Sequence, residues 1–427
     1  MNIMVIGGGG REHAIIKKLK QSSKIDIIFA LPGNGGIAMD AVCTGIGASD
    51  ISAILAFAKE NSIDFAVVAP DDPLVLGVVD ELENIGVPCF GPNKSAAIIE
   101  GSKAFSKNLM KNYSIPTADY EVFTDVHKAL NYLESAPIPT VIKADGLALG
   151  KGVVIAMTRD EAKTAVRSMM EDKVFGQSGA TVVIEEYLEG PEVSVLSFTD
   201  GKTLVPMVSS MDHKRAHDGD TGLNTGGMGT VAPNPYYTEE IAAECMEKIF
   251  LPTINAMNSE NRSFKGCLYF GLMLTAQGPK VIEYNCRFGD PETQVVLPLL
   301  ESDLVDIMVA TRNGTLCDAD IRFSNGAACC VIMASSGYPE KYEKGFEITL
   351  SLPEPADTEI YVAGARLENG KLLTNGGRVL GVTAKGEDLP SAVAKAYEAV
   401  KLVHFDNSFY RRDIGQKALE FLNKEAH

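Results

Sequence analysis

The pentapeptide EYNCR at 283–287 combines residue types that suit phosphates and a metal ion. Residues 280–286 predict a strand, and alternate residues of a strand share a face, so Glu283, Asn285 and Arg287 should point together. Mg²⁺ takes few protein oxygens beside phosphate oxygens, and arginine binds phosphate in a bidentate way. The pattern favours a magnesium–phosphate site over a solvated strand face with one Glu–Arg pair. On the opposite, half-buried face we expect Ile282, Tyr284 and Cys286.

A glycine-rich segment, Gly146–Gly152, resembles a Walker A loop but departs from its rules. Gly150 comes one residue early, and Gly152 replaces the hydroxyl residue that would hold magnesium. A strand follows it, where a Walker A loop would lead into a helix. We therefore interpret the segment as a hairpin tip that folds over nucleotide phosphates, with Lys151 on the tip and Lys143 on the preceding strand. An ordinary hairpin is the alternative.

The opening strand ends in four glycines, Gly7–Gly10, as a dinucleotide-binding turn would. The third glycine position of that motif holds Glu12, and the second strand ends near Asn34, where an NAD site has an acidic residue. A nicotinamide dehydrogenase is therefore the least favoured function. Backbone N–H groups at such a turn, with Arg11 beside them, could bind a phosphate; a tight turn without a ligand stays equally open.

His213 and His217 have the i, i+4 spacing of two metal ligands on a helix. Lys214 and Arg215 lie between them, and cations repel a metal, so we reject a zinc site. The cluster Asp212–Arg215 suits an anionic substrate better. No G-x-S-x-G or Cys/His signature supports covalent nucleophilic catalysis.

The elements around these residues predict an α/β protein. Strands are expected at 3–6, 25–30 and 65–69, and helices at 11–20 and 51–60, the second capped by Ser49-Asp50. Such alternation implies a parallel sheet whose ligands lie at the carboxyl ends of the strands. Further strands are expected at 140–144, 152–156 and 180–186, with a helix at 159–171. The stretch 211–235 lacks helix and strand signals and predicts a functional loop. The last hundred residues predict an α+β domain with strands at 327–333, 358–362 and 377–383 and a helix at 389–403.

Composition sets the class of protein. The 427 residues suit several domains, and 45% hydrophobic with 22% charged residues fits a globular enzyme. A net charge of −17 argues against nucleic acid or anionic membrane as partners. The eight cysteines form no C-x-x-C pair, no apolar run could span a membrane, and the N-terminus does not resemble a signal peptide. We expect a cytoplasmic protein with free thiols.

Several motifs together resemble one family, the glycinamide ribonucleotide synthetases or phosphoribosylamine–glycine ligases. In that family's order they are Gly7–Ala14 (GGGGREHA), Glu100–Phe105 (EGSKAF), Val141–Val153 (VIKADGLALGKGV), Asp212–Arg215 (DHKR), Asn224–Gly229 (NTGGMG) and Glu283–Gln294 (EYNCRFGDPETQ). Gly376–Thr383 (GGRVLGVT) and Tyr410–Gly415 (YRRDIG) resemble its C-terminal domain. The resemblance spans nearly the whole chain.

The resemblance implies an N-terminal Rossmann-like, pre-ATP-grasp domain (1–100), an ATP-grasp α+β region (101–325, with a lid at about 120–190) and a small C-terminal α+β domain (326–427). It implies a purine-biosynthesis ligase that joins glycine to 5-phosphoribosylamine and cleaves ATP to ADP and phosphate through glycyl phosphate. Mg²⁺ or Mn²⁺ would be the metal. We expect a monomer that can make transient contact with the enzyme supplying phosphoribosylamine.

The resemblance also implies roles for individual residues. The ATP-binding residues would be Lys103, Lys143, Gly150, Lys151, Gly152, the hinge Glu185-Glu186-Tyr187-Leu188 and, on the ribose, Glu192. The metal ligands would be Glu283 and Asn285. The catalytic residues would be Asp212, Lys214 and Arg287. The substrate pocket would add Gly9, Arg11, Asn34, Gly227 and Asp290.

Departures from the family pattern remove no charged group. They are Asp71 in place of a glutamate, Leu149 in the lid, Tyr187 in the hinge and Cys286 in the strand. Two other functions remain to be distinguished. One is an ATP-grasp ligase that activates bicarbonate, which would share the phosphate machinery and differ in the acceptor pocket. The other is a non-catalytic nucleotide-binding regulator, against which Glu283, Asn285 and Arg287 argue.

Overall fold

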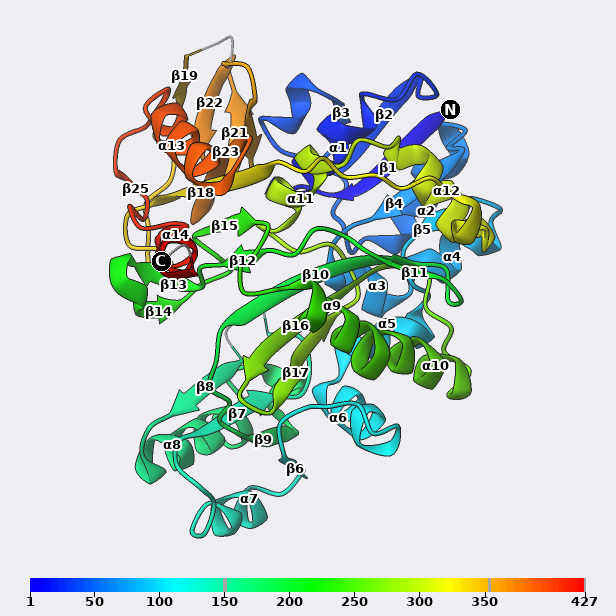
Figure 1. Ribbon diagram of the computed structural model, residues 1–427. Helices are drawn as coiled ribbons and strands as arrows, with labels where there is room; N and C mark the ends of the chain where they lie inside the picture. Colours follow the sequence, from blue (N-terminus) through cyan, green and yellow to red (C-terminus); the bar gives the residue numbers. More distant parts are fainter. Residues whose placement is uncertain (149–151, 352–354, 426–427) are drawn as a thin grey trace.

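The computed structural model describes residues 1–148, 152–351 and 355–425 (Figure 1). The N-terminal part is a parallel sheet of order β3-β2-β1-β4-β5. Its strands are β1 (Asn2–Gly7), β2 (Ile27–Pro32), β3 (Val42–Cys43), β4 (Phe65–Val68) and β5 (Cys89–Phe90). The helices of this part are α1 (Gly10–Leu19), α2 (Ile51–Glu60), α3 (Asp71–Leu76) and α4 (Val78–Asn84), with a 3₁₀ turn at Ile37–Met39. The predicted parallel sheet is thus confirmed, and Asp50 caps α2 through the N–H of Ala53.

Two helices, α5 (Lys94–Gly101) and α6 (Lys103–Asn112), lead into a small antiparallel sheet of order β6-β9-β7-β8. Its elements are β6 (Tyr120–Phe123), α7 (Val126–Tyr132), β7 (Thr140–Ala144), β8 (Val153–Ala156), α8 (Arg159–Met170), a 3₁₀ turn at Gly176–Gly179 and β9 (Val182–Glu186). This unit, which we call the lid, projects from the rest of the molecule in Figure 1. The predicted hairpin is present, because β7 and β8 pair antiparallel.

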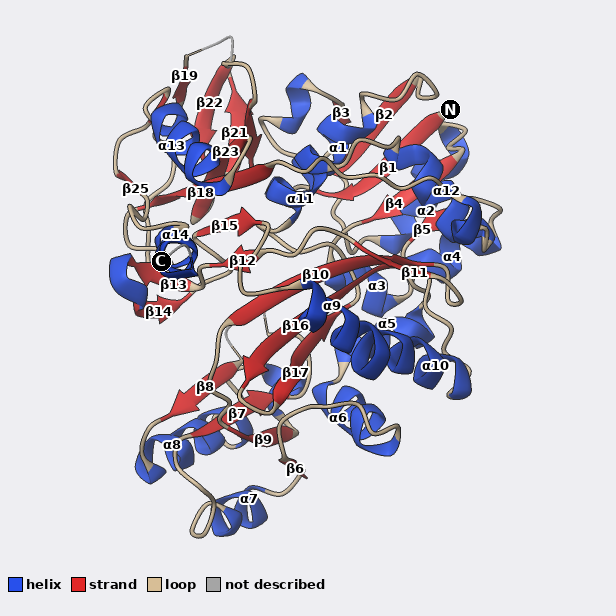
Figure 2. Ribbon diagram, in the orientation of Figure 1, coloured by secondary structure: helices blue, strands red, loops and turns tan. Residues whose placement is uncertain are grey.

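A second antiparallel sheet, of order β11-β10-β16-β17, lies at the centre of the molecule (Figure 2). Its strands are β10 (Glu192–Thr199), β11 (Leu204–Pro206), β16 (Gly266–Thr275) and β17 (Gly278–Asn285). Beside it run α9 (Glu239–Cys245), a π-helical turn (Met246–Phe250) and α10 (Leu251–Ser259). Residues 187–191 connect this central sheet to the lid.

Most of the remaining elements form the C-terminal part. Its sheet has the order β12-β15-β18-β23-β20 and comprises β12 (Met211–Asp212), β15 (Gly229–Ala232), β18 (Ala327–Ser335), β20 (Thr358–Val362) and β23 (Arg378–Gly386), with β25 (Ser408–Phe409) also paired to β18. Short pairs join β13 (Arg215–His217) to β14 (Thr221–Asn224), β19 (Thr349–Leu350) to β24 (Val403–His404), and β21 (Ala365–Glu368) to β22 (Lys371–Thr374). Its helices are α13 (Leu389–Val400) and α14 (Gln416–Glu425), with a 3₁₀ turn at Asp218–Asp220. Helices α11 (Thr293–Leu299) and α12 (Leu304–Asn313) and the 3₁₀ turn at Leu316–Asp318 instead share a buried cluster with the N-terminal strands β1 and β2.

Two predictions about elements were wrong. The stretch 211–235 is not a structureless loop, since it contains β12, β13, β14 and β15. Each is only a few residues long, and β15 is stabilised by pairing with β18, about a hundred residues away, which local patterning does not reveal. The helix predicted at 389–403 ends three residues earlier, at Val400, and Val403 already belongs to strand β24.

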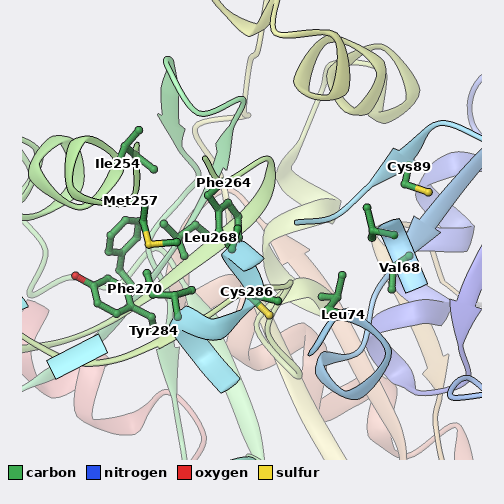
Figure 3. Close-up of a cluster of buried hydrophobic side chains, with 14 of the residues drawn as sticks. Val68, Leu74, Cys89, Ile254, Met257, Phe264, Leu268, Phe270, Tyr284 and Cys286 are labelled. Carbon is green, nitrogen blue, oxygen red and sulfur yellow. The ribbon is translucent and has the colours of Figure 1, made fainter. Parts of the chain in front are cut away.

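A buried apolar cluster joins the N-terminal sheet to the central sheet (Figure 3). It includes Val68 of β4, Leu74 of α3, Phe270 of β16, and Tyr284 of β17. Tyr284 and the buried Cys286 anchor the end of β17, and the Tyr284 hydroxyl is 2.8 Å from Oγ1 of Thr253. The strand that carries Glu283 and Asn285 is therefore held rigidly from behind. No helix in the described part of the chain is long and apolar enough to cross a membrane.

Candidate active site

Strand β17 presents Glu283 and Asn285 on its open side. Glu283 lies opposite Gly271 of β16, and a Cβ at Gly271 would come 2.8 Å from Cγ of Glu283. The register shifts between Gly271 and Leu272, which leaves Ile282 outside the pairing. The sequence predicted that Ile282 shares a face with Tyr284, and this prediction was wrong. The buried residues of this stretch are Val281 and Tyr284. The Ile282 carbonyl instead accepts a hydrogen bond from Nζ of Lys143 at 2.8 Å.

Cations surround the Glu283 carboxylate. Burial alone raises its pKa, but the neighbouring cations outweigh burial and bring that pKa below its usual value. They come from separate elements and are Lys214, Lys143, Lys103 and Arg287. Lys214 is the one within ion-pair distance, at 3.8 Å from Oε1 of Glu283. An excess of positive charge around one carboxylate favours the binding of a polyanion that carries its own metal ion.

Two of these lysines approach from the lid side. Lys143 on β7 lies 3.0 Å from Oε2 of Glu185 on β9. Lys103 begins α6 and donates to the Gly146 carbonyl at 3.0 Å, which ties it to the glycine-rich hairpin. One turn further along α6, Lys107 is buried and lies 3.4 Å from the same Glu185 oxygen. Burial lowers the pKa of Lys107 to about 8.

Arg287 follows the end of β17 and is fixed by neighbours on two sides. Its Nη2 donates to Oδ1 of Asn285 at 3.1 Å and lies 2.9 Å from Oε1 of the buried Glu100. Asp71, one of the departures from the family pattern, is 3.9 Å from the same nitrogen. Within the described residues, the buried Nε of Arg287 has no hydrogen-bond partner. A buried donor without a partner is costly, and a ligand oxygen would satisfy it.

The predicted hinge connects the lid to the central sheet. Glu185 and Glu186 end β9, Tyr187 and Leu188 follow, and β10 starts at Glu192. Glu186 is exposed and lies 3.6 Å from Lys280, whereas Glu185 is buried. Glu192 lies 2.8 Å from Nζ of Lys214. The predicted contacts with adenine and ribose are not tested by these positions.

The hairpin tip is described only in part. Leu149, Gly150 and Lys151 lie outside the described residues, so the predictions made for them stay predictions. At the base of the hairpin, the Gly152 carbonyl accepts the N–H of Ala144 at 2.8 Å. Gly146 packs so closely against Ser178 that an added Cβ would come 2.5 Å from its Oγ.

Beside the lysines lies a pair of interacting acids, Asp212 of β12 and Glu292. Burial raises the pKa of both carboxyl groups, and repulsion from Glu292 adds to the rise at Asp212, whose pKa lies well above its usual value. Gly227 lies against them with φ +112°, and a Cβ there would be 2.6 Å from Oδ1 of Asp212. The Glu292 carboxylate accepts from Ser194 Oγ at 3.3 Å. Such a pair favours a cation between the two acids.

The N-terminal glycine turn reaches Asp290 in the same region. The backbone N–H of Arg11 donates to Oδ2 of Asp290 at 3.3 Å. Arg378, from β23, donates to the Asp290 carbonyl at 2.9 Å and lies 3.3 Å from its Oδ1. At the helix start, Glu12 accepts the Gly9 N–H at 2.6 Å. A carboxylate of the chain itself therefore fills part of the anion position that the glycines offered.

Asn34 has a structural task in this region. Its Nδ2 donates to the carbonyls of Gly8 and Val362, at 2.9 and 2.8 Å. Its Oδ1 accepts the N–H groups of Gly36 and Ile37, at 2.8 and 2.9 Å. The amide thereby makes three hydrogen bonds within the N-terminal part and one, to Val362, that joins it to the C-terminal part. Its predicted contact with a sugar phosphate stays a prediction.

The two histidines have separate environments. His213 is buried, with Nδ1 3.1 Å from the Gly229 carbonyl and Nε2 accepting the Gly415 N–H at 3.1 Å. His217 is exposed on β13. Among the residues that the structure describes, no group of three or more His, Cys, Asp or Glu could hold a metal ion.

Four site residues received no role from the sequence. They are Glu100, Lys107, Glu292 and Arg378. Lys107 carried a usable signal, since it follows Lys103 by four residues and so shares its helix face. Glu100 and Glu292 stood inside quoted motifs, but their partners lie up to 187 residues away, as for Glu100 and Arg287.

Comparison with known proteins identifies the fold class of the chain. A family model described as the ATP-grasp (A) domain of phosphoribosylglycinamide synthetase matches residues 101–293. The fold is similar to that of the biotin carboxylase domain of Hydrogenobacter thermophilus 2-oxoglutarate carboxylase, solved with magnesium ADP and bicarbonate. The TM-score is 0.75 at 16% identity, covering 96% of this chain and 91% of that one. The chain therefore has the ATP-grasp fold.

The family follows from closer similarities. Models of the N domain and C domain of phosphoribosylglycinamide synthetase match residues 1–100 and 328–417. The phosphoribosylamine–glycine ligase of Halalkalibacterium halodurans is 48% identical over 419 residues, which cover 98% of this chain and 97% of the relative. The crystal structure of the Thermotoga maritima phosphoribosylamine–glycine ligase gives a TM-score of 0.84 at 34% identity, covering 97% and 100% of the two chains. The chain belongs to the phosphoribosylglycinamide synthetase family, as its motifs predicted.

Proposed function

We propose that this chain joins glycine to 5-phosphoribosylamine, with cleavage of ATP to ADP and phosphate. The observation that carries the proposal is the convergence of Lys103, Lys143, Lys214 and Arg287 on Glu283. A carboxylate is a poor acyl donor, and phosphorylation by ATP converts it into a reactive acyl phosphate. Phosphoryl transfer needs positioned positive charge more than a covalent nucleophile, and this site supplies that charge.

ATP would lie between the lid and the central sheet. Lys103 and Lys143 would contact its phosphates, and the Gly146–Gly152 hairpin would cover them. The hinge Glu185–Leu188 would hold adenine through its backbone, with Glu192 on the ribose. Glu192 is paired with Lys214 at 2.8 Å, so ribose hydroxyls bound to Glu192 would share its carboxylate with Lys214.

The donor set fits a divalent ion. Glu283 offers a carboxylate and Asn285 an amide oxygen, and the unpartnered Nε of Arg287 offers a donor for a phosphate beside them. Few protein oxygens completed by phosphates are the preference of Mg²⁺, and Mn²⁺ accepts similar ligands. When bound, the ion would neutralise phosphate charge and make the terminal phosphorus easier to attack.

Glycine would bind with its ammonium group near Asp212 and Glu292. Their raised pKa values show that the pair resists carrying two negative charges, and a bound cation would relieve that repulsion. Gly227 and Asp290 would line the same pocket. Gly9, Arg11 and Asn34 would face the sugar phosphate of phosphoribosylamine at the end of the glycine turn.

The chain's own residues would then carry the reaction. Arg287 and Lys214 would stabilise the charge of the transferring phosphoryl group as the glycine carboxylate attacks it. The amine of phosphoribosylamine would next attack the glycyl carbonyl, and phosphate would leave. Closure of the lid would exclude water, which would otherwise hydrolyse the acyl phosphate.

The test is ADP release with glycine and phosphoribosylamine each omitted in turn, compared with bicarbonate in place of glycine. We expect sustained ADP release only with ATP, glycine and phosphoribosylamine together. Bicarbonate-dependent turnover would instead assign a carboxylating ligase. ADP release that needs neither acceptor would contradict the proposal, and Lys143→Ala should lower the rate on the order of 10²–10³-fold.

We further propose that the chain acts in the cytoplasm as a monomer and takes the labile phosphoribosylamine from the preceding enzyme by transient contact. Domain boundaries near residues 100 and 325 would separate the N-terminal, ATP-grasp and C-terminal domains. Size-exclusion chromatography with light scattering tests the oligomeric state.

A further inference from the structure

Arg411 lies on the C-terminal segment between β25 and α14. Helix α14 lies next to the β13–β14 hairpin in Figure 1. Only 2% of its side chain is exposed, so its charge must be compensated by neighbours. Its Nε and Nη2 donate to the two carboxylate oxygens of Asp413, each at 2.8 Å. Its Nη1 donates to Oδ1 of Asp220 at 2.8 Å and to the Arg215 carbonyl at 3.1 Å. One guanidinium therefore binds the hairpin to the C-terminal segment.

The residues next to Arg411 extend this contact. Asp413 also accepts the N–H of Gly219 at 2.8 Å, and the backbone N–H of Arg412 donates to Asp218 at 2.8 Å. The N–H of Gly415 donates to Nε2 of His213 at 3.1 Å. We call residues 411–415, with these partners, the C-terminal clamp. It holds the segment from 213 to 220 at several separate points.

The clamped segment leads directly into the candidate active site. His213 stands between Asp212, which interacts with Glu292, and Lys214, which contacts Glu192 and Glu283. His213 Nδ1 also lies 3.1 Å from the carbonyl of Gly229, on the strand that returns from the hairpin. The imidazole thus links the C-terminal segment to both sides of the loop that carries the site residues.

We propose that Arg411 is a positioning residue, which acts through the C-terminal clamp to fix Asp212 and Lys214 for the acceptor half of the reaction. The proposal rests on the proposed function of the site. The lysines that would bind ATP, Lys103 and Lys143, belong to α6 and β7, where their partners are Gly146 and Glu185. Within the described part of the chain, no hydrogen bond or ion pair joins them to the clamp. Loss of the clamp should therefore weaken glycine use more than nucleotide binding, because it disturbs Lys214 but leaves Lys103 and Lys143 in place.

The variants Arg411→Lys and Asp413→Asn test this, with Arg412→Ala as the matched control. Arg412 is the neighbouring arginine, but its side chain is exposed and only its backbone enters the clamp. For both clamp variants we expect the KM for glycine to rise about 10-fold to 100-fold, since Asp212 would hold the glycine ammonium group and loss of one hydrogen bond to a charged group typically weakens binding by about that factor. The KM for ATP should rise by a clearly smaller factor than the KM for glycine, and Arg412→Ala should match the wild type.

Hydrogen exchange supplies a readout independent of activity. Amides of 213–220 should exchange faster in the clamp variants, while those of β10 and β16 keep their wild-type protection. A folded clamp variant with an unchanged KM for glycine overturns the proposal. So does an equal loss of ATP affinity, which would mark a general structural role. If the wild type does not use glycine, the proposed function fails, whereas local exchange at 213–220 still reports whether the clamp exists. Asp413→Asn keeps its side-chain volume and serves where Arg411→Lys does not fold.

Discussion

The Nζ atom of Lys143 lies 3.0 Å from Oε2 of Glu185, and both side chains are at least nine-tenths buried. The two residues stand on adjacent lid strands, where Val141 pairs with Glu185 and Lys143 with Val183. The contact holds a lysine in the direction of the site before any nucleotide is bound. Glu185 thus neutralises buried lysines, a role additional to the backbone contacts that the hinge motif implied.

Substitution Glu185→Gln should destabilise the lid. It leaves Lys143 and the buried Lys107 without their shared carboxylate, and removal of one partner from a buried ion pair typically costs about 3–5 kcal/mol. Thermal and urea unfolding should show this loss in the free energy of unfolding. The neighbouring Glu186→Gln, at an exposed position, is the control and should change stability by less than about 0.5 kcal/mol. Equal stability of the two variants would contradict this role for Glu185.

Substitution Glu283→Gln should nearly abolish turnover. It removes the proposed metal carboxylate, on which four cations act, and we expect kcat to fall on the order of 10²–10³-fold. Steady-state ADP release over a range of Mg²⁺ concentrations measures the effect. The exposed Glu239→Gln serves as the control. An unchanged rate with an unchanged Mg²⁺ dependence would remove Glu283 from the site.

Substitution Gly227→Ala should damage the acceptor pocket. Its φ of +112° is strained for any residue with a side chain, and a Cβ would be 2.5 Å from Cδ of Pro291. Strain of this kind costs about 1–3 kcal/mol, so we expect a lower Tm and a raised KM for glycine. Gly370→Ala separates the two effects, because φ is +76° there and nothing lies within 4 Å of the added Cβ. A glycine KM that rises equally in both variants would contradict the expectation.

Stability should fall in mild acid because of His213. Burial lowers its pKa from 6.5 to about 4, with the Arg411 charge acting in the same direction. Between these values the unfolded chain binds the additional proton, so stability rises with pH through the window and is lost as the pH falls from 6.5 to about 4. The loss from this residue is about 3 kcal/mol.

Urea unfolding of the wild type and His213→Gln across this pH range measures that loss. The variant cannot take up the proton, so its stability should depend less steeply on pH. His217→Gln, at an exposed position on β13, should follow the wild type. Parallel pH curves for all three proteins would show that folding does not shift the pKa of His213.

The N-terminal fold could be predicted from the sequence because its strands and helices carry their own signals. The buried run of β1 and the Asp50 cap of α2 are local features, and the helix predicted at 51–60 agrees with α2, Ile51–Glu60. The strands between 211 and 232 could not be predicted in this way. They are short and partly glycine-rich, and β15 is stabilised by a distant partner strand, β18.

The sequence could predict those parts of the candidate site whose residues lie together in one motif. Glu283, Asn285 and Arg287 are adjacent in sequence, and the structure brings Lys143 and Lys214 to them. The contribution of Arg378 and Glu100 depends on chain segments brought together only by folding. The bulge at Ile282 was also hidden, because an alternating pattern does not reveal a shift of register.

The sheet β12-β15-β18-β23-β20 also limits how the gene can be cut and recombined. A fragment that begins near residue 326 would keep β18 but lose β15, so an unpaired edge would invite self-association. A transplantable C-terminal module has to bring residues 211–232 with it, and those residues include Asp212 and Lys214. Exchanging this module between relatives would therefore exchange part of the acceptor chemistry as well as a scaffold.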